Sequence, residues 1–355
     1  MTVKRDMARP PVIFFLVLPY GISAGFASVT LPFLLVQHGF SVAAAASITA
    51  LGLSANLWRF VWAPVTDITL SLHKWYLIGI VFCAATLLLL CFIPFNSQST
   101  FLLSSVVLFS QVAATFVVAP VGGFMAKTIA EEKKGRAAGW YQAGNAGGMG
   151  IGGGAGIWLS SQFTYQTAGI ILSVVMLVCA LALYYIPSVP SEKKDSLKDG
   201  FAMIVTDVKG LLRSPIAVFS TIVIISPIGI GAAAYIWSSV GADWKVSTNT
   251  VALVTGVLNG VISTLGCVFG GWFADKAGRW WAFFGAGTLM AVVALLMGIA
   301  AFNSPNYVIG VSFYAFTFGF ASAAFTAVAL HAIGKGLASF KYALISSISN
   351  IPRFI

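Results

Sequence analysis

Long apolar runs separated by short polar segments dominate this chain. A helix crosses the hydrocarbon core of a bilayer with ~20 apolar residues, and ten runs reach that length, while an eleventh begins near Lys341 and includes only fifteen residues before the sequence ends at Ile355. The pattern therefore predicts an all-α membrane protein with about eleven spans. The ten long runs cover 11–36, 42–66, 75–95, 101–126, 137–160, 166–187, 214–240, 250–273, 280–302 and 306–332.

A polar stretch divides the runs into two groups. We predict an N-terminal bundle at 1–187, a linker at 188–213 and a C-terminal bundle at 214–355. Apolar residues recur in the linker at helical spacing, which is typical of a helix lying on the membrane face; a solvated connector with chance periodicity is the alternative. The recurring residues are Leu197, Phe201, Ile204, Val205, Val208 and Leu212.

Composition and charge placement support a membrane location. With 59% hydrophobic and 8% charged residues, the chain lacks the polar surface of a soluble domain. The net charge of +10 does not indicate nucleic acid, because 17 of the 20 basic residues lie at the N-terminus or in alternate loops, and the opposite loops contain only Lys245. The positive-inside rule then predicts a cytoplasmic N-terminus. The first run is too long for a cleavable signal peptide, so we interpret it as a span.

No pattern in the sequence indicates catalysis. We find no metal-ligand spacing, no paired nucleophile and base, and no phosphate-binding loop after a strand, so we expect neither an enzyme nor a cofactor. The glycines at 152–154 lie inside an apolar run, which excludes a nucleotide-binding loop. All four cysteines also lie in apolar runs without paired spacing, and we interpret them as packed side chains: Cys83, Cys91, Cys179 and Cys267.

Two aspartate motifs lie at matching places in the two groups of runs. Asp67 and Asp275 each follow the second run of their group, 208 residues apart. The second motif, Gly271-x-x-x-Asp275-Lys276-x-Gly278-Arg279, resembles the cytoplasmic signature of the major facilitator superfamily. The resemblance implies two six-helix-type bundles with pseudo-two-fold symmetry, twelve spans, and a cytoplasmic gate formed at these motifs. The expected gate residues are Asp67, Gly271, Asp275, Lys276, Gly278 and Arg279.

The first motif is more specific. Arg59-Phe60-x-Trp62-Ala63-Pro64-x-x-Asp67 resembles the AmpG-type anhydromuropeptide permeases and the related acetyl-CoA transporters. Two weaker matches are Lys127-Thr128 with Glu131-Glu132 and Gly135, and Tyr342-Ala343-Leu344-x-Ser346-Ser347. This resemblance implies alternating-access import of an anhydromuropeptide-like or other anionic solute across a bacterial inner membrane. Efflux of a small organic anion or metabolite is the alternative. A non-transporting sensor or degraded relative is a third hypothesis, which sequence beyond Ile355 would test.

Arg59 is the one basic residue well inside a complete apolar run. Because no carboxylate lies inside any apolar run to neutralise it, Arg59 either snorkels to the interface or faces the cavity and binds an anionic group. The resembled permeases have acids where this chain has Pro120 and Phe124, so we do not expect proton coupling. His38, His73 and His331 lie near span ends or in loops and are predicted to be interfacial.

Sparse polar residues on the runs are the expected substrate contacts. In the resembled superfamily the first, fourth, seventh and tenth helices line the cavity, and neighbouring helices supply further amides. The predicted substrate-binding residues are Arg59, Asn56, Tyr20, Ser23, Gln111, Thr115, Gln142, Asn145, Tyr235, Asn259, Tyr314 and Thr317. A four-residue glycine stripe predicts close helix packing at Gly144, Gly148, Gly152 and Gly156. We expect a monomer whose partners are a small solute and the bilayer.

Overall fold

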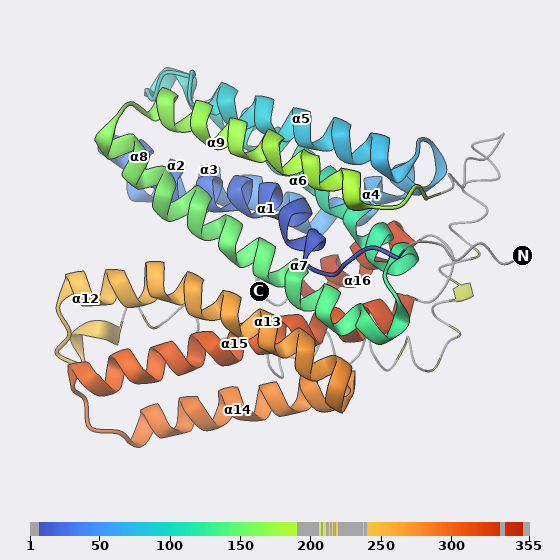
Figure 1. Ribbon diagram of the computed structural model, residues 1–355. Helices are drawn as coiled ribbons and strands as arrows, with labels where there is room; N and C mark the ends of the chain where they lie inside the picture. Colours follow the sequence, from blue (N-terminus) through green and yellow to red (C-terminus); the bar gives the residue numbers. More distant parts are fainter. Residues whose placement is uncertain are drawn as a thin grey trace, which may run out of the picture.

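The computed structural model describes residues 7–189, 240–333 and 338–350, together with isolated positions between 206 and 237. Every regular element in this described part is helical (Figure 1). The domain boundaries predicted from sequence stay predictions, because the linker and the run at 214–240 lie almost entirely outside the described residues.

The first half of the chain supplies most of the described helices. A continuous helical path runs through α1 (Val12–Gly25), η1 (Phe26–Thr30) and α2 (Leu31–Gln37). After α3 (Val42–Leu53), the path breaks at Ser54 and continues as α4 (Ala55–Ile68). The remaining elements of this half are α5 (Leu72–Leu90), η2 (Ser97–Ser99), α6 (Thr100–Thr128), η3 (Glu131–Lys133), α7 (Lys134–Gly150), η4 (Ile151–Ala155), α8 (Gly156–Gln162), α9 (Tyr165–Cys179) and η5 (Ala180–Tyr185).

The second half contributes a long helical layer and one separate helix. In Figure 1, α12 to α15 lie together on one side of α7, whereas α16 lies among the helices of the first half. The elements described here are η7 (Val240–Ala242), α12 (Thr248–Ala252), η8 (Leu253–Leu258), α13 (Asn259–Ala277), α14 (Arg279–Ile299), α15 (Ser304–Ile333) and α16 (Ala338–Asn350).

The observed helices follow the predicted runs wherever the structure describes them. Seven of the described helical stretches are long and apolar enough to cross a membrane. The predicted run 42–66 is divided between α3 and α4, and 137–160 corresponds to the glycine-rich path through α7, η4 and α8. The eleventh run is helical from Ala338 to Asn350.

The glycine stripe lies against α1. A Cβ added at Gly148 would lie 2.5 Å from the Leu18 carbonyl oxygen, and one added at Gly144 or Gly152 would collide with a carbonyl oxygen of α1. Only residues without a side chain allow this approach. Next to it, the Thr30 hydroxyl lies 2.8 Å from the carbonyl oxygens of both Gly152 and Gly153 in the π-helical segment η4 and shares its proton between them.

Candidate functional site

Asp275 joins the two halves of the molecule at one end. It lies in the last turn of α13, which ends at Ala277 and is followed by Gly278, whose φ of +99° suits glycine. The backbone N–H groups of Gly135 and Arg136, in the first turn of α7, donate to Asp275 Oδ1 at 2.6 Å and Oδ2 at 3.0 Å. The carboxylate therefore caps a helix of the other half, where unpaired N–H groups and the helix dipole favour negative charge.

The backbones of α13 and α7 lie close together, which brings the Asp275 carboxylate within hydrogen-bonding distance of α7. A Cβ on Gly271 would lie 2.6 Å from the Gly135 carbonyl oxygen and 2.7 Å from Gly139 Cα, so α13 and α7 approach without intervening side chains. Arg136 Nε also donates to Asp275 Oδ2 at 2.9 Å, but the Arg136 side chain is 45% exposed. Exposed ion pairs contribute little, and the two backbone bonds therefore hold the carboxylate in place.

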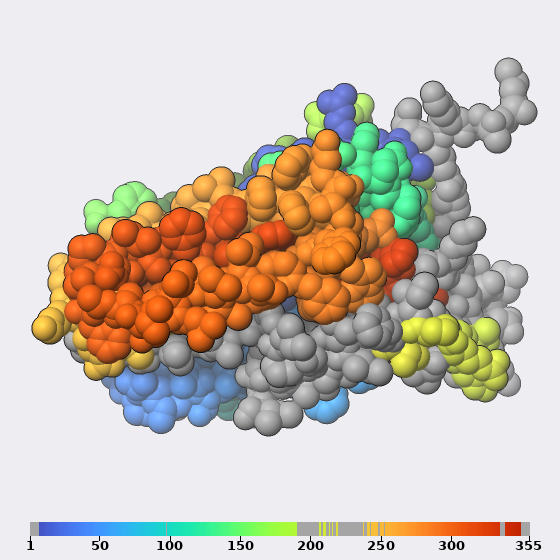
Figure 2. All heavy atoms as spheres, turned by 90° about the horizontal axis from the view of Figure 1, so that it is seen from below, coloured from blue at the N-terminus to red at the C-terminus, as the bar shows by residue number. Residues whose placement is uncertain are grey.

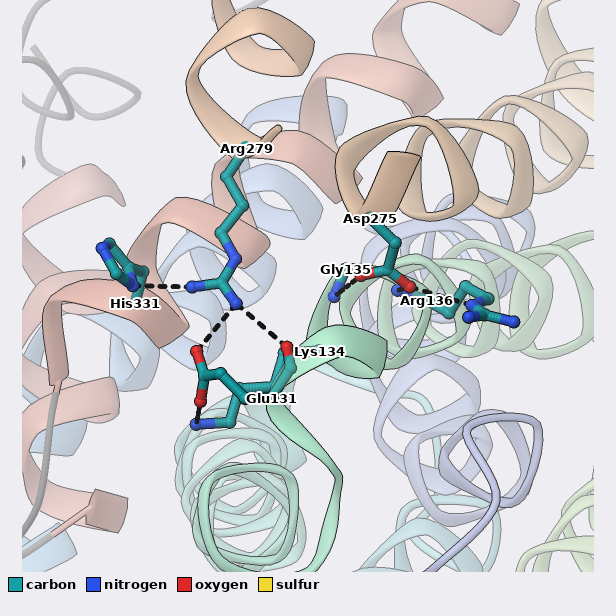
Figure 3. Close-up of polar contacts among 7 residues, drawn as sticks. All are labelled: Glu131, Lys134, Gly135, Arg136, Asp275, Arg279 and His331. Atoms are coloured by element: carbon teal, nitrogen blue, oxygen red, sulfur yellow. Dashed lines mark hydrogen bonds and ion pairs between the residues drawn. The ribbon is translucent and has the colours of Figure 1, made fainter. Parts of the chain in front are cut away.

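A second set of contacts joins the halves beside Asp275. Arg279 Nη2, from the start of α14, donates to Glu131 Oε1 at 2.7 Å and to the Glu131 carbonyl at 3.0 Å. Arg279 Nη1 lies 2.6 Å from His331 Nδ1, and Lys134 pairs with Glu131 at 2.7 Å. Figure 3 shows these contacts together with the Asp275 cap, and we call the residues drawn there the latch: Glu131, Lys134, Gly135, Arg136, Asp275, Arg279 and His331.

Glu131 is held as a carboxylate in the latch. Partial burial raises the pKa of Glu131, but hydrogen bonds from Lys134 and Arg279, together with their charges, outweigh burial and lower the pKa to about 2. Glu131 thus remains ionised at physiological pH. In Figure 2 the green surface around η3 and α7 adjoins the orange surface of α13 and α14, so the latch closes over a continuous contact.

Asp67 caps a helix in the same way as Asp275, but here the aspartate belongs to the first half and the capped helix to the second. It lies in the last turn of α4, and its Oδ2 accepts from the backbone N–H of Phe340, in the first turn of α16, at 2.9 Å. The sequence places Asp67 at the membrane surface, but in the structure it is only 5% exposed. The reason is that α16 covers α4, with Ile68 packed on Phe340 and Ala63 packed on Ala343.

Arg59 is buried two helical turns before Asp67. It is 5% exposed, and its Nε and Nη2 atoms have no hydrogen-bond partner among the described residues. Its side chain does not snorkel to water, and the alternative in which it faces the interior agrees with this placement. The charge acts on the buried hydroxyls of Tyr141 on α7 and Tyr342 on α16, which also hydrogen-bond to each other.

Polar side chains predicted from sequence surround this position. The Tyr20 hydroxyl donates to Asn56 Oδ1 at 2.8 Å, one turn from Arg59, and Tyr20 also acts electrostatically on both tyrosines. Gln142 Nε2 donates to Thr326 Oγ1 at 2.7 Å, which links α7 to α15. We call the following residues the Arg59 cluster: Tyr20, Asn56, Arg59, Tyr141 and Tyr342.

Several other predicted substrate-binding residues form hydrogen bonds within the protein. Gln111 Nε2 donates to the hydroxyl of Ser23 at 3.1 Å, and Thr115 accepts from Trp62 Nε1 at 2.7 Å. Thr317 donates to carbonyls of its own helix. Tyr314 is buried beside Trp237, Asn145 and Asn259 are half-buried, Lys276 is exposed, and Tyr235 lies outside the described residues.

Several residues of these sites were not among the predicted site residues. In the sequence, Tyr141 and Thr326 have no distinguishing signal, although Tyr141 directly precedes Gln142. Tyr342 and Glu131 belong only to the weaker resemblance, and Arg136 is one of the basic loop residues. Among the described residues, no group of three or more His, Cys, Asp or Glu side chains is placed to hold a metal ion.

Helices packed in two groups, with reciprocal aspartate caps between the groups, define a helical membrane-transporter fold. The profile of the Major Facilitator Superfamily matches residues 13–355, and the chain belongs to this superfamily. None of the curated proteins matches the sequence.

Solved structures show the same fold. One is the human organic anion transporter MFSD10 (TETRAN), with a TM-score of 0.74, 14% identity, and coverage of 97% of this chain and 90% of that one. The proton:xylose symporter XylE has a TM-score of 0.68, 15% identity, and coverage of 97% and 88%. A bacterial homologue of the iron transporter ferroportin has a TM-score of 0.64, 14% identity, and coverage of 96% and 88%. At these identities the likeness concerns the fold alone.

Proposed function

We propose that this protein is a secondary transporter that carries an anionic solute by alternating access, with Arg59 as the anion contact. The observation that carries the proposal is the buried guanidinium edge of Arg59, which has no hydrogen-bond partner in the part of the chain that the structure describes. An isolated buried charge is strongly unfavourable unless a counter-charge compensates it. No acidic residue lies inside an apolar run, so a bound anion is the natural counter-charge.

The aspartate caps support a gating role at one end of the molecule. Asp67 and Asp275 each cap a helix of the opposite half, so separating the halves would break both sets of bonds. The basic loops, including Lys127, Lys133 and Lys276, flank this end, and the positive-inside rule makes it cytoplasmic. We infer that the structure represents a state closed toward the cytoplasm, with Gly271, Gly278, Lys276 and Arg279 completing the gate.

Two solute classes fit the Arg59 cluster. The motif from Arg59 to Asp67 favours import of an anhydromuropeptide-like solute across a bacterial inner membrane, because it resembles the anhydromuropeptide permeases. A small organic anion is the second candidate, and the name of the human organic anion transporter MFSD10, which has the same fold, agrees with it. Both classes carry a carboxylate that Arg59 could bind.

Ligand-dependent thermal stability tests the proposal. The detergent-purified protein is heated with anhydromuropeptides, acetyl-CoA, small organic acids and their neutral analogues, since a ligand stabilises the state it binds by RT ln(1 + [L]/Kd). We expect a saturable increase with an anionic ligand, lost in Arg59→Ala and kept in the control Lys74→Ala, whose side chain is exposed. Equal stabilisation of wild type and Arg59→Ala, or stabilisation by neutral analogues alone, would overturn the anion assignment.

A further inference from the structure

The two unpartnered nitrogens of Arg59 lie on one edge of its guanidinium group. Nη2 is the terminal nitrogen trans to Cδ, so its N–H bond and the Nε–H bond point in nearly parallel directions. Neither atom has a partner among the described residues. Two parallel donors with this spacing match the two oxygens of a carboxylate, which is the geometry of bidentate arginine recognition. A single point charge such as chloride cannot use both donors equally well.

Two tyrosines, one from each half, lie close enough for the Arg59 charge to act on both. Tyr141 is 3% exposed and Tyr342 2% exposed, so neither hydroxyl is available to bulk water. Their rings meet edge to face with centroids 5.5 Å apart, Tyr141 from α7 of the first half and Tyr342 from α16 of the second. Beside them, Ser347 of α16 donates to the Asn56 carbonyl at 3.3 Å, which holds α16 against α4. The tyrosine pair therefore exists only while the halves are together at this level.

The charge of the cluster limits the ligand to a monoanion. Among the described residues, Arg59 is the one cation that acts on both Tyr141 and Tyr342. One guanidinium neutralises one carboxylate, whereas a phosphate monoester, with about two negative charges near neutral pH, would keep about one unpaired charge in a buried place. The phenol hydroxyls can donate to, or accept from, a polar group next to the carboxylate.

We propose that the Arg59 edge is a bidentate carboxylate site, and that Tyr141 and Tyr342 close over it as specificity residues supplied by the two halves. This inference rests on the proposed function and refines it: the transported solute carries a single carboxylate, and it reaches Arg59 when the tyrosine pair separates. Both free nitrogens are buried in the closed arrangement, so exchange of the solute requires the halves to move at this level.

The variant Arg59→Lys separates the contribution of the two parallel N–H donors from that of the positive charge. Lysine keeps the positive charge but presents one ammonium group in place of two parallel donors. The probes are sodium acetate and sodium chloride at equal ionic strength, added to the purified protein while its thermal unfolding is followed. We expect acetate to stabilise wild type saturably and more than chloride, and Arg59→Lys to weaken acetate binding by roughly tenfold or more. Tyr141→Phe combined with Tyr342→Phe should weaken it by a smaller factor.

The outcomes separate two claims, that Arg59 binds an anion and that its Nε–Nη2 edge binds a carboxylate in bidentate fashion. If Arg59→Lys binds acetate like wild type while Arg59→Ala does not, the bidentate edge is wrong and the anion-binding function stands. If Arg59→Ala also binds acetate like wild type, both are wrong. Equal stabilisation of wild type by acetate and chloride, or none by acetate, overturns the carboxylate assignment. Lys74→Ala is the matched control for a lost positive charge, and unfolding without added acetate shows whether each variant is folded.

Discussion

At the scale of single residues, buried charge is the main feature of this molecule. Arg59 and Asp67 lie on the same helix, eight residues and ~12 Å apart along its axis, and each retains a buried polar atom without a partner among the described residues. The sequence identified Arg59 as an intramembrane charge because it lies well inside the apolar run 42–66. It could not identify Tyr141 and Tyr342 as neighbours, since both lie on other helices and long-range packing decides their position.

His331 makes the latch sensitive to pH. Arg279 contacts its ring, and the charges of Glu131 and Lys134 also act on it. Arginine can only donate, so His331 Nδ1 must accept from Arg279 and is unprotonated in the closed latch. The neighbouring charge of Arg279 opposes that of a protonated ring, so His331 gains its proton below the pH of ~6.5 at which an ordinary imidazole titrates. A proton on Nδ1 would remove the acceptor and place a second positive charge beside Arg279. We therefore predict that acidification from about pH 7.5 to about pH 4.5 opens the latch, with the response below the range of an unperturbed histidine.

Spin labels on either side of the latch provide the measurement. Glu132→Cys and Lys276→Cys place labels at exposed positions of the first and second halves. The distance distribution should gain a longer component at the lower pH, and the matched variant His331→Gln should lose this response because glutamine does not titrate in this range. A response that is the same in His331→Gln would assign the pH effect to another group. Glu131, whose pKa is about 2, stays ionised throughout this range.

At the scale of helices, glycine decides where helices touch. The stripe predicted on the fifth run packs on α1, and the sequence predicted it because the glycines recur every four residues. No pattern in the sequence indicates that the same helix also contacts α13 through Gly135 and Gly139, because that contact depends on the arrangement of the two halves. Similarly, the reciprocal caps could be predicted only as two matching motifs, and their helix partners came from the structure.

Three glycine substitutions separate packing within a half from closure between halves. Gly152→Ala places a methyl group against the Ile22 carbonyl of α1, and we predict a loss of stability of ~1–3 kcal/mol through overpacking. Gly271→Ala places it against α7 of the other half, so the protein should fold but the latch should open. Gly150→Ala has nothing within 4 Å of the new methyl group and serves as the control.

Two readouts distinguish these effects. Thermal unfolding in detergent should show destabilisation in Gly152→Ala and wild-type behaviour in Gly150→Ala. The distance between labels at positions 132 and 276 should lengthen in Gly271→Ala only. If Gly271→Ala has the same label distance as wild type, the added methyl group between α7 and α13 does not open the gate. The proposed role of their close contact in gating would then be wrong.

At the scale of the whole molecule, two halves held together by reciprocal caps surround Arg59, whose Nε and Nη2 have no partner among the described residues. The latch and the Asp67 cap lie at one end, and Arg59 lies deeper in the same seam, with Tyr342 arriving from the other half. This arrangement couples solute binding to gating. A carboxylate reaches Arg59 only when the helices that carry the tyrosines and the aspartate caps move apart. Binding and gating therefore use the same helices, α4, α7 and α16.

Anion transport in reconstituted liposomes tests the central claim most directly. Uptake of a carboxylate that stabilises the purified protein, and of its neutral analogue, is measured for wild type, Arg59→Ala and the control Lys74→Ala. The account predicts saturable uptake of the carboxylate by wild type and by Lys74→Ala, no uptake of the neutral analogue, and loss of at least ~90% of uptake in Arg59→Ala, as expected when a buried counter-charge loses its only partner. Uptake by Arg59→Ala at the wild-type rate, or binding without any transport by wild type, would contradict it.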